Sequence, residues 1–396
     1  TILVLNSERF HKDLEILKNN NTFNFLSFPV ELHYRISAPF SYLIKSDLYK
    51  KKWYEISNTV NWKNYLQLHS DFIKKLQNFL KFFYNIKIII TPSFYYFQDR
   101  AWENASFNNN FPYLVFFRES FKDPKSIDYY ISRYVDRNYK FLGSSIYVYN
   151  NFEKKCLIDA GVCNPQKVEV LGSPRFDNII KKSQINEINE GDCITLFSFR
   201  HTIATYKLDP KNSSDGFSFI GDGAVKLFDK VHGEFARQAI LNPKTKFFIK
   251  LKFLGRWKEY VEKSIEDYNN RSASTIPNLY ILDDIDPQYL ILKSNLIIAI
   301  NSTVIVESRI LGKKTAVPVF EEANTTLKDF IYLEKFFSNE IHKINSLVDL
   351  QDLIKESIKK PFQIKKINNS EIVSDYIGFY DTDHTNRYIN FMKKII

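Results

Sequence analysis

Short apolar runs of strand length alternate with helix-like patterns over much of the chain. The alternation is clearest at residues 278–320, where the apolar runs 279–282 and 296–300 are flanked by polar or turn-forming residues. A short helix-like piece separates these runs, and a helical segment ending at Gly312 leads to a third run, 315–320. This order of strands and helices predicts half of a doubly wound parallel sheet.

The same alternation extends to the rest of the chain, where further apolar runs predict strands. They cover residues 1–5, 86–90, 112–117, 145–149, 167–171, 193–199 and 246–253. The most convincing helical pattern is 65–84, whose apolar positions include Phe72, Phe79 and Phe83. Residues 24–62 are rich in aromatic and charged side chains and predict no element.

A polar stretch without periodicity, residues 181–192, is typical of a linker. A chain of 396 residues is too long for one ordinary core and favours two domains. We therefore expect a Rossmann-like domain over residues 1–180, a second over 193–380, and a final helical segment, 381–396, that packs back on the first.

Composition places the chain among globular proteins, with 44% hydrophobic and 25% charged residues. No apolar run reaches the ~18 residues that a membrane-spanning helix needs, and the first residues read as a strand and not as a signal peptide. The three cysteines have no metal-ligand spacing, and an odd number argues against a disulfide framework. These features favour a cytoplasmic protein.

The formal net charge of +10 fits nucleic acid, an anionic membrane surface or an anionic substrate. The basic residues are spread along the chain without a nucleic-acid-binding signature, so we expect no nucleic-acid partner. The charge favours peripheral association with the inner face of an anionic membrane.

The turn after the predicted strand 296–300 carries the most promising chemistry. Open parallel sheets bind ligands at the carboxyl ends of their strands, and a helix beginning at Asn301-Ser302-Thr303 would present N–H groups and hydroxyls to an anion there. Glu307, about one turn further, could accept from a ribose hydroxyl. The alternative interpretation is an ordinary N-cap followed by a solvated glutamate.

Cations follow two neighbouring predicted strands. Lys250 and Lys252 alternate on one face near the end of the strand 246–253, and Arg200 and His201 follow the strand 193–199. The two lysines could neutralise a phosphate or pyrophosphate group, and together with Arg200 or His201 they would offset the charge of a leaving group. A half-exposed strand with solvated lysines is the alternative.

Arg118 and Glu119 follow the predicted strand 112–117, where an arginine could contact an anionic acceptor and a glutamate could act as general base. A surface salt bridge is an equally good explanation. His232, alone in a helical pattern, is interpreted as structural. Asp381, Asp383 and His384 resemble a metal cluster only in composition, and Asp383 could cap the last helix.

The segment VEVLGSPRFD, residues 168–177, predicts a shaped turn, since glycine permits a tight backbone and proline fixes it. It resembles the strand and Gly-x-Pro-Arg-x-Asp segment that closes the first domain in bacterial surface-polysaccharide transferases. The stretch SNLIIAINSTVIVESRILGKKTAVPVF resembles their hydrophobic strand, Ser/Thr pair, Glu and Gly-Lys-Pro segment. These enzymes include the CDP-glycerol glycerophosphotransferase (teichoic acid polymerase) family and related surface carbohydrate biosynthesis proteins.

This resemblance, which covers about residues 145–320, implies an α/β protein of the GT-B architecture. Two Rossmann-like domains would face a central cleft, with the acceptor on the first and the nucleotide-linked donor on the second. Gly172, Pro174, Arg175 and Asp177 would form a structural turn near that cleft. Ser302, Thr303 and Glu307 would contact the donor, and neither metal nor cofactor would be required.

The resemblance thus implies a glycosyltransferase that moves a sugar from a nucleotide-activated donor to a surface glycan or a lipid-linked acceptor. An ulosonic or nonulosonic acid carried by CMP would be one such donor. Two departures leave the donor open: Lys250-Leu251-Lys252 stands where relatives often carry His-Pro, and Thr315 replaces the proline of Gly-Lys-Pro.

Three other functions stay open. A polyol-phosphate transferase would use a CDP donor. An enzyme of the UDP-N-acetylglucosamine 2-epimerase type shares the architecture, although its acidic and histidine catalytic set is not evident. A non-enzymatic glycan- or nucleic-acid-binding protein would also fit the charge.

Overall fold

A computed structural model describes residues 1–121, 127–184, 193–199, 206–207, 218–219, 223–252, 257–326, 341–360 and 373–396. The chain forms two compact units. The first consists of Thr1–Asp177 together with Ser370–Ile396, and the second of Asn178–Asn369. The first unit is therefore built from two stretches of chain, with the second unit inserted between them in sequence.

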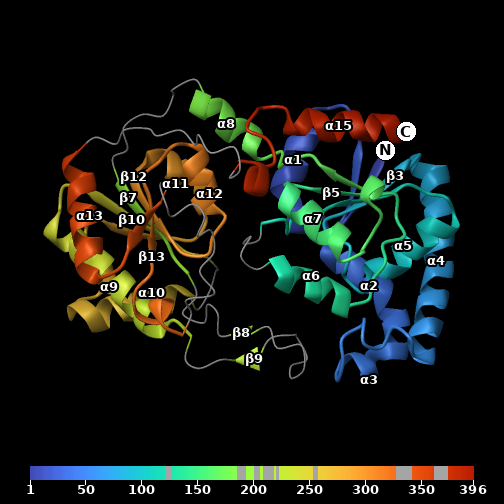
Figure 1. Ribbon diagram of the computed structural model, residues 1–396, viewed down its shortest axis with the longest axis horizontal. Coiled ribbons are helices and arrows are strands. Elements are labelled where there is room, and N and C mark those ends of the chain that lie inside the picture. The colour runs from blue at the N-terminus through green and yellow to red at the C-terminus, as the bar shows by residue number, and fades with distance from the viewer. Residues whose placement is uncertain are drawn as a thin grey trace. The chain divides into compact units, whose positions relative to one another are not determined.

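Six parallel strands in the order β2-β1-β3-β4-β5-β6 form the sheet of the first unit (Figure 1). They are β1 Ile2–Leu5, β2 Phe25–Phe28, β3 Ile88–Thr91, β4 Tyr113–Phe116, β5 Ser145–Val148 and β6 Val168–Val170. Parallel strands buried on both faces read as unbroken apolar runs, and for this reason all but β2 could be recognised in the sequence. The strand β2 lies at the edge of the sheet, is half-buried throughout and is interrupted by Ser27.

Two apolar layers enclose this sheet because successive strand side chains point to opposite faces. Leu3 and Leu5 pack with side chains of α4, α5 and α7, whereas Ile2 and Val4 pack with side chains of α1 and α15. The helices of the unit are α1 His11–Asn19, α2 Val30–Ser41, α3 Lys45–Leu48, α4 Val60–Tyr84, α5 Asp99–Asn108, α6 Ile127–Asp136, α7 Asn151–Asp159 and α15 His384–Ile395. Helix α15 comes from the second stretch of chain and completes one of the two layers.

The second unit also has six parallel strands, in the order β11-β10-β7-β12-β13-β14. They are β7 Cys193–Phe197, β10 Lys246–Lys250, β11 Leu279–Leu282, β12 Ser294–Ala299, β13 Thr315–Pro318 and β14 His342–Ile344. The prediction of doubly wound parallel sheets is confirmed, although the pattern did not predict the short edge strand β14. A separate antiparallel pair is formed by β8 Tyr206–Lys207 and β9 Ser218–Phe219.

Helices cover both faces of the second sheet. Helices α9, α10 and α13 lie on one side and α11 and α12 on the other (Figure 1). Their bounds are α8 Phe176–Gln184, which leads into the unit, α9 Val225–Leu241, α10 Trp257–Asn269, α11 Pro287–Lys293, α12 Val304–Ile310 and α13 Leu347–Lys359. None of the helices in the described ranges is long and apolar enough to cross a membrane.

Each sheet has one point where the strand order reverses. In the first unit the chain runs from β1 to β2 and returns to β3 on the other side of β1, and in the second the reversal lies between β7 and β12. Ligands of open α/β sheets bind at the carboxyl ends of the strands that meet at such a switch point. The switch points are therefore where we expect ligand sites.

Gly233 offers a test of how closely α9 and α10 pack. A Cβ atom at this position would lie 2.3 Å from the ring of Tyr268 on α10. We expect Gly233→Ala to lower the free energy of unfolding by about 1–3 kcal/mol through overpacking, measured by urea denaturation. The exposed replacement Lys226→Ala at the start of the same helix should change it by less than about 0.5 kcal/mol. Equal effects of the two replacements would show that the contact is not tight.

Candidate functional site

The turn after β12 lies at the switch point of the second unit. Ala299 pairs with Phe197 at the ends of β12 and β7, so the residues that follow both strands continue at the same edge. Asn301 adopts a left-handed backbone conformation with φ of 47°, which turns the chain into α12. Ser302 and Thr303, both half-buried, come next.

The turn is not a strong helix cap. Thr303 occupies the N-cap position without a side-chain cap bond, and the Ser302 hydroxyl accepts from the Val304 N–H at a long 3.4 Å. Helix α12 has only seven residues, too short for its dipole to define an anion site. The hydroxyls of Ser302 and Thr303, and not the N-terminus of α12, are therefore the groups that could bind an anion.

Glu307 is the acidic residue nearest to this turn along the chain. Its N–H donates to the Thr303 carbonyl at 3.1 Å, which places it one turn into α12, and only 6% of the residue is exposed. A carboxylate is seldom buried without partners that hold it. The alternative of a solvated surface glutamate does not describe Glu307.

The predicted cations occupy different environments. The Lys250 ammonium donates to the carbonyls of Leu251 at 2.9 Å and Asp283 at 2.8 Å, so it holds the loop after β11. Lys252 is exposed just beyond the end of β10. Arg200 and His201 lie outside the described residues. The roles proposed for these four residues stay predictions.

His232 on α9 reaches the same edge from inside the unit. Its Nδ1 lies 2.8 Å from the Phe228 carbonyl and its Nε2 lies 2.9 Å from Ser198 Oγ. Because a carbonyl only accepts, Nδ1 carries the proton and Nε2 accepts from the serine hydroxyl. Burial lowers the pKa of His232 to about 4, so the ring is neutral and fixes the residue that follows β7.

A hollow of about 360 Å³ opens further along the same edge, past the carboxyl ends of β13 and β14. Its walls are Phe320, Glu321, Asn324, Thr325, Asn345, Ser346 and Leu347. The neighbouring Glu322 is already engaged, since its carboxylate accepts from the N–H groups of Lys226 and Leu227 at the start of α9. The volume falls in the range of small-ligand pockets.

In the first unit, Arg118 and Glu119 lie just beyond β4 and are both partly exposed. Their side chains form a long ion pair of 3.9 Å, which contributes little by itself. Arg118 also donates to the Arg9 carbonyl, and the Tyr95 hydroxyl donates to Glu119. The structure thus holds both side chains at the carboxyl edge of the sheet, and their acceptor and base roles stay predictions.

The switch point of the first unit contains a polar cluster whose members show no common pattern in the sequence. The Asp99 carboxylate accepts from Asn6 Nδ2 at 3.0 Å and from the Thr91 hydroxyl at 2.9 Å, and His33 Nδ1 lies 3.0 Å from Asn6 Oδ1. Burial raises the pKa of Asp99 to about 7, although its hydrogen bonds oppose this. Asn6 directly follows β1, and the other three residues belong to α2, β3 and α5, so only the fold brings them together.

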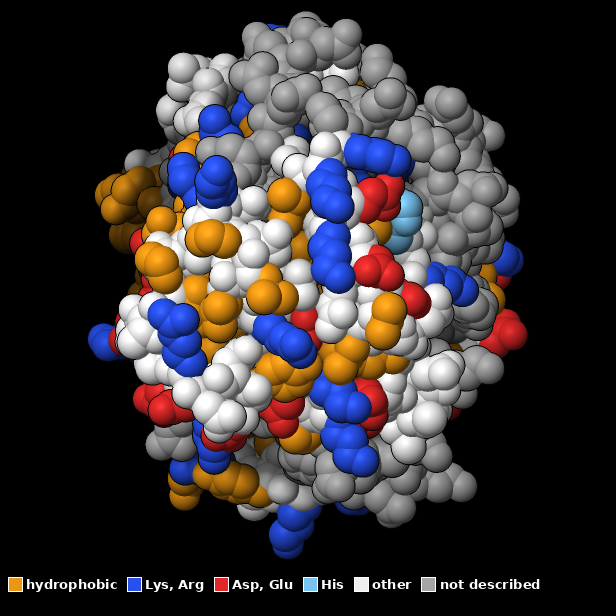
Figure 2. Space-filling model, turned by 90° about the vertical axis from the view of Figure 1, so that its left-hand side faces the viewer, with side chains coloured by type: hydrophobic (Ala, Val, Ile, Leu, Met, Phe, Trp, Pro, Cys, Tyr) orange, Lys and Arg blue, Asp and Glu red, His pale blue; other side chains and the backbone are white. Residues whose placement is uncertain are grey.

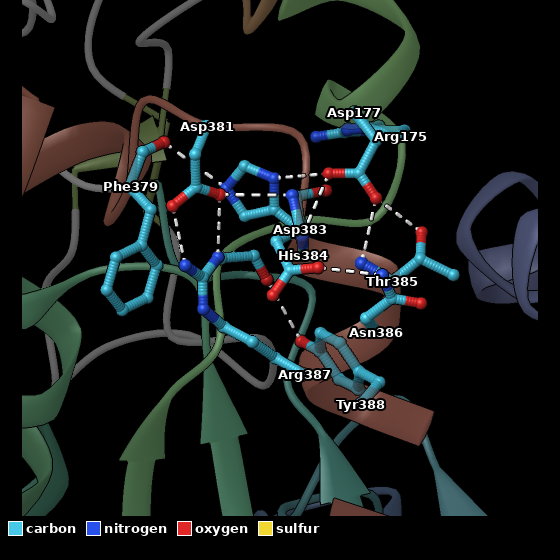
Figure 3. A network of polar contacts seen from close by, with 12 residues as sticks. Arg175, Asp177, Phe379, Asp381, Asp383, His384, Thr385, Asn386, Arg387 and Tyr388 are labelled. Atoms are coloured by element: carbon cyan, nitrogen blue, oxygen red, sulfur yellow. Dashed lines mark hydrogen bonds and ion pairs between the residues drawn. The ribbon is translucent and has the colours of Figure 1, made fainter. Parts of the chain in front are cut away.

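The turn at residues 172–177 binds the N-terminus of α15 within the first unit (Figure 3). The Asp177 carboxylate accepts from the backbone N–H of His384 at 2.9 Å and of Thr385 at 2.8 Å, and from the Thr385 hydroxyl. His384 Nδ1 lies 2.6 Å from the same carboxylate. Asp177 thus caps a helix more than 200 residues away in sequence.

The other residues of the turn shape this contact. Gly172 has φ of +75°, and a Cβ there would lie 1.9 Å from the His384 ring. Asp13 of α1 accepts from the Ser173 hydroxyl at 2.9 Å and from the Arg175 N–H at 3.2 Å, while the Pro174 carbonyl accepts from the Asp177 N–H. These residues serve the packing of the unit.

Asp381 and Asp383 also have structural partners (Figure 3). Arg387 donates two hydrogen bonds to Asp381. Asp383 is the N-cap residue of α15, but its side chain accepts from Asn386 Nδ2 instead of making a cap bond. Within the described ranges, no group of three His, Cys, Asp or Glu side chains could hold a metal ion.

Two parallel six-stranded sheets, one per unit, with helices on both faces define an α/β protein of the GT-B fold. The chain is similar to the UDP-GlcNAc 2-epimerase of Methanocaldococcus jannaschii, solved with UDP-GlcNAc and UDP. The identity is 11%, 99% of each chain is covered, and the TM-score is 0.53. The UDP-GlcNAc 2-epimerase of Neisseria meningitidis, bound to UDP-GlcNAc, is 14% identical to this chain. The match covers 99% of each chain, and its TM-score is 0.50.

At such low identity the likeness shows the fold alone. The wall teichoic acid polymerase TagF gives a TM-score of only 0.46 at 10% identity. No protein-family model matches the sequence, and neither does any curated protein.

Replacing Asp177 should release the start of α15. We expect Asp177→Asn to lower the free energy of unfolding by about 1–3 kcal/mol, because the buried N–H groups of His384 and Thr385 lose a charged acceptor. Hydrogen exchange of the amides of residues 384–395 should speed up. Asp383→Asn at the same helix end is the matched control and should have little effect. Unchanged exchange in Asp177→Asn would contradict the cap.

Acid should have the same effect on the wild-type chain. Burial raises the pKa of Asp177, but the hydrogen bonds from His384 and Thr385 outweigh it and leave the pKa below the ordinary value. A lowered pKa in the folded state means that this stabilisation is complete above about pH 4. It is lost as the pH falls through the folded-state value. Exchange of the α15 amides, corrected for intrinsic rates, should therefore rise below about pH 4, and less so in Asp177→Asn.

Proposed function

We propose that the protein is an enzyme that binds a nucleotide-activated sugar at the carboxyl edge of the second sheet. The observation that carries the proposal is the nearly buried carboxylate of Glu307 beside the switch point of β7 and β12. Rossmann-like sheets place nucleotides at this point, with an acidic residue on the ribose hydroxyls. Ser302 and Thr303 supply hydroxyl donors for phosphate oxygens.

The donor would lie along the edge that runs from this turn toward the hollow at β13 and β14. That hollow is large enough for a base or a sugar ring. Lys252, exposed at the end of β10, would add positive charge for the leaving phosphate. Lys250 is already bound to two carbonyls and would act mainly by shaping the loop.

The reaction we favour is transfer of the sugar to a surface glycan or a lipid-linked acceptor. Support comes from the sequence resemblance to surface-polysaccharide transferases and from the partly exposed Arg118 and Glu119 at the edge of the first sheet. Glu119 would accept the proton of the acceptor hydroxyl, and Arg118 would contact an anionic acceptor. CMP-linked ulosonic acids and CDP-linked polyol phosphates are the donors to examine beside UDP-hexoses.

A 2-epimerase reaction is the second candidate. It is favoured by the fold, since two UDP-GlcNAc 2-epimerases cover 99% of this chain at TM-scores of 0.53 and 0.50. Such an enzyme needs no acceptor. Epimerisation would require acid and base groups beside the sugar.

Nucleotide binding tests the proposal directly. In a thermal-shift panel of CMP, CDP, UDP, GDP and ADP, we expect one pyrimidine nucleotide to stabilise the chain by about 2.7 kcal/mol at 100 times its dissociation constant. Glu307→Gln should weaken that nucleotide at least about tenfold by loss of a charged acceptor. Glu259→Gln, an exposed carboxylate on α10, is the matched control.

A chelator should leave the shift unchanged, because the proposal assigns no role to a metal. No shift with any nucleotide would overturn the proposed function, and an equal loss in Glu259→Gln would overturn the role of Glu307. Incubation with UDP-GlcNAc alone, followed by NMR at C2 of the sugar, separates the candidates. Epimerised product without an acceptor favours the 2-epimerase reaction over transfer.

A further inference from the structure

Arg9 lies at the switch point of the first unit, in the short 3₁₀ helix Ser7–Phe10 that follows β1. The residue is half-buried. Its guanidinium carbon lies 4.3 Å from the centre of the Tyr96 ring, so the cation stacks on that ring. Tyr96 belongs to the loop that follows β3, the other strand of the switch point.

Arg118 reaches the same place from the end of β4. Its side chain donates a hydrogen bond to the Arg9 carbonyl, and its N–H donates to the Pro92 carbonyl at 3.4 Å. Strands β1 and β4 flank β3 in the sheet, so the three carboxyl ends bring these loops together. Burial raises the pKa of Tyr96, and Glu119 adds to the rise. Arg9 and Arg118 oppose it, so both cations lie near the Tyr96 hydroxyl.

Among the described residues, neither guanidinium has a close carboxylate partner. Arg9 forms no ion pair there, and Arg118 has only the long 3.9 Å pair with Glu119. The buried Asp99 acts on Arg9 from beyond ion-pair distance and is held by neutral donors. Cations held near each other repel unless an anion lies between them. An anionic ligand would supply what this part of the first unit lacks.

Arg137 adds a third cation to the same surroundings. Its guanidinium carbon lies 4.6 Å from the centre of the Tyr95 ring, and the Tyr95 hydroxyl donates to Glu119. In the described part of the chain, Glu119 is thus the one exposed carboxylate among three guanidiniums. The excess of positive charge extends on both sides of the residue assigned as the base.

This excess is local. Three other arginines of the first unit each pair closely with a carboxylate: Arg35 with Glu31, Arg100 with Glu103 and Arg387 with Asp381. Figure 2 shows one face of the second unit, on which basic and acidic side chains are likewise intermixed. Arginine without a close carboxylate is therefore a feature of the switch point and not a general property of the chain.

We propose that Arg9 and Arg118 together bind a carboxylate or phosphate group of the acceptor, so that the acceptor is an acidic glycan. Guanidinium groups match the oxygens of both anions in a planar, two-bonded geometry. Because Glu119 lies beside Arg118, an acceptor held in this way has its neighbouring hydroxyl groups near the base. A neutral acceptor would leave the two cations unmatched, so Arg9 and Arg118 determine specificity.

Calling the ligand an acceptor rests on the proposed function, whereas the anion site rests on contacts within the first unit alone. Isothermal titration calorimetry with small sugars tests the site. At about 0.05 M salt, we expect trigalacturonate, which carries carboxylates, to bind at least about tenfold more tightly than neutral maltotriose. The pair of glucose 6-phosphate and glucose tests phosphate in the same way. Affinity for the preferred anion should fall as salt rises to about 0.5 M.

Replacement of the two arginines places the binding. Arg9→Gln and Arg118→Gln should each weaken the preferred anionic sugar at least about tenfold, because a charge-assisted contact is lost. Arg35→Gln is the matched control, since this arginine of the same unit is 76% exposed, and it should bind like the wild type. Circular dichroism melting establishes that each variant is folded.

Equal affinities for charged and neutral sugars in both pairs would overturn the anion site. So would unchanged affinity in either switch-point variant, or an equal loss in Arg35→Gln. The nucleotide panel separates this inference from the proposed function. Anionic sugar that binds while no nucleotide shifts the melting temperature would overturn the proposed function and leave the anion site. A nucleotide shift without any preference for anionic sugars would do the reverse.

Discussion

The carboxylate of Asp177 is the contact on which the first unit depends. It receives the first N–H groups of α15, and α15 in turn covers, together with α1, one face of the sheet. Tyr388, Ile389 and Met392 are almost fully buried there, and burial of such side chains contributes about 1.5–3 kcal/mol each. One polar cap therefore fixes the helix that closes an apolar layer.

In the second unit, polar residues around the carboxyl edge divide into two groups. Lys250 and Glu322 are engaged by backbone groups of neighbouring loops and helices, and His232 fixes Ser198. These contacts hold the strand ends in place. Ser302, Thr303 and Glu307 stand within this held edge, at the point where the strand order reverses. Strand ends that are held by hydrogen bonds in this way can position the side chains that bind a small ligand.

Much of the fold could be predicted from the sequence because buried parallel strands appear as continuous apolar runs. The strands β2 and β14 were not predicted because Ser27 interrupts the first, and polar residues occupy two of the three positions of the second. Helix α4 was visible as apolar residues at helical spacing, but spacing alone does not say which of them meet the core, as Ile73 does, and which meet solvent, as Phe83 does.

Part of the candidate site could also be predicted from the sequence. A strand followed by Asn-Ser-Thr and a glutamate indicates the edge of a sheet from local sequence. The cluster of Asp99, Asn6, Thr91 and His33 could not be predicted, since its members lie on or next to four different elements and are up to 93 residues apart. The cap by Asp177 could not be predicted for the same reason, because His384 and Thr385 come after the whole second unit in the sequence.

The order of synthesis gives this arrangement a further consequence. When Asp177 leaves the ribosome, the helix that it caps has not been made, and roughly 200 residues must follow. At typical translation rates this takes on the order of 10 to 40 s, during which one face of the first sheet has α1 but lacks α15. The inserted second unit, a continuous stretch, can meanwhile fold by itself. The part of this apolar face that α15 covers thus stays exposed in the nascent first unit, and exposed apolar surface of this kind is what chaperones bind.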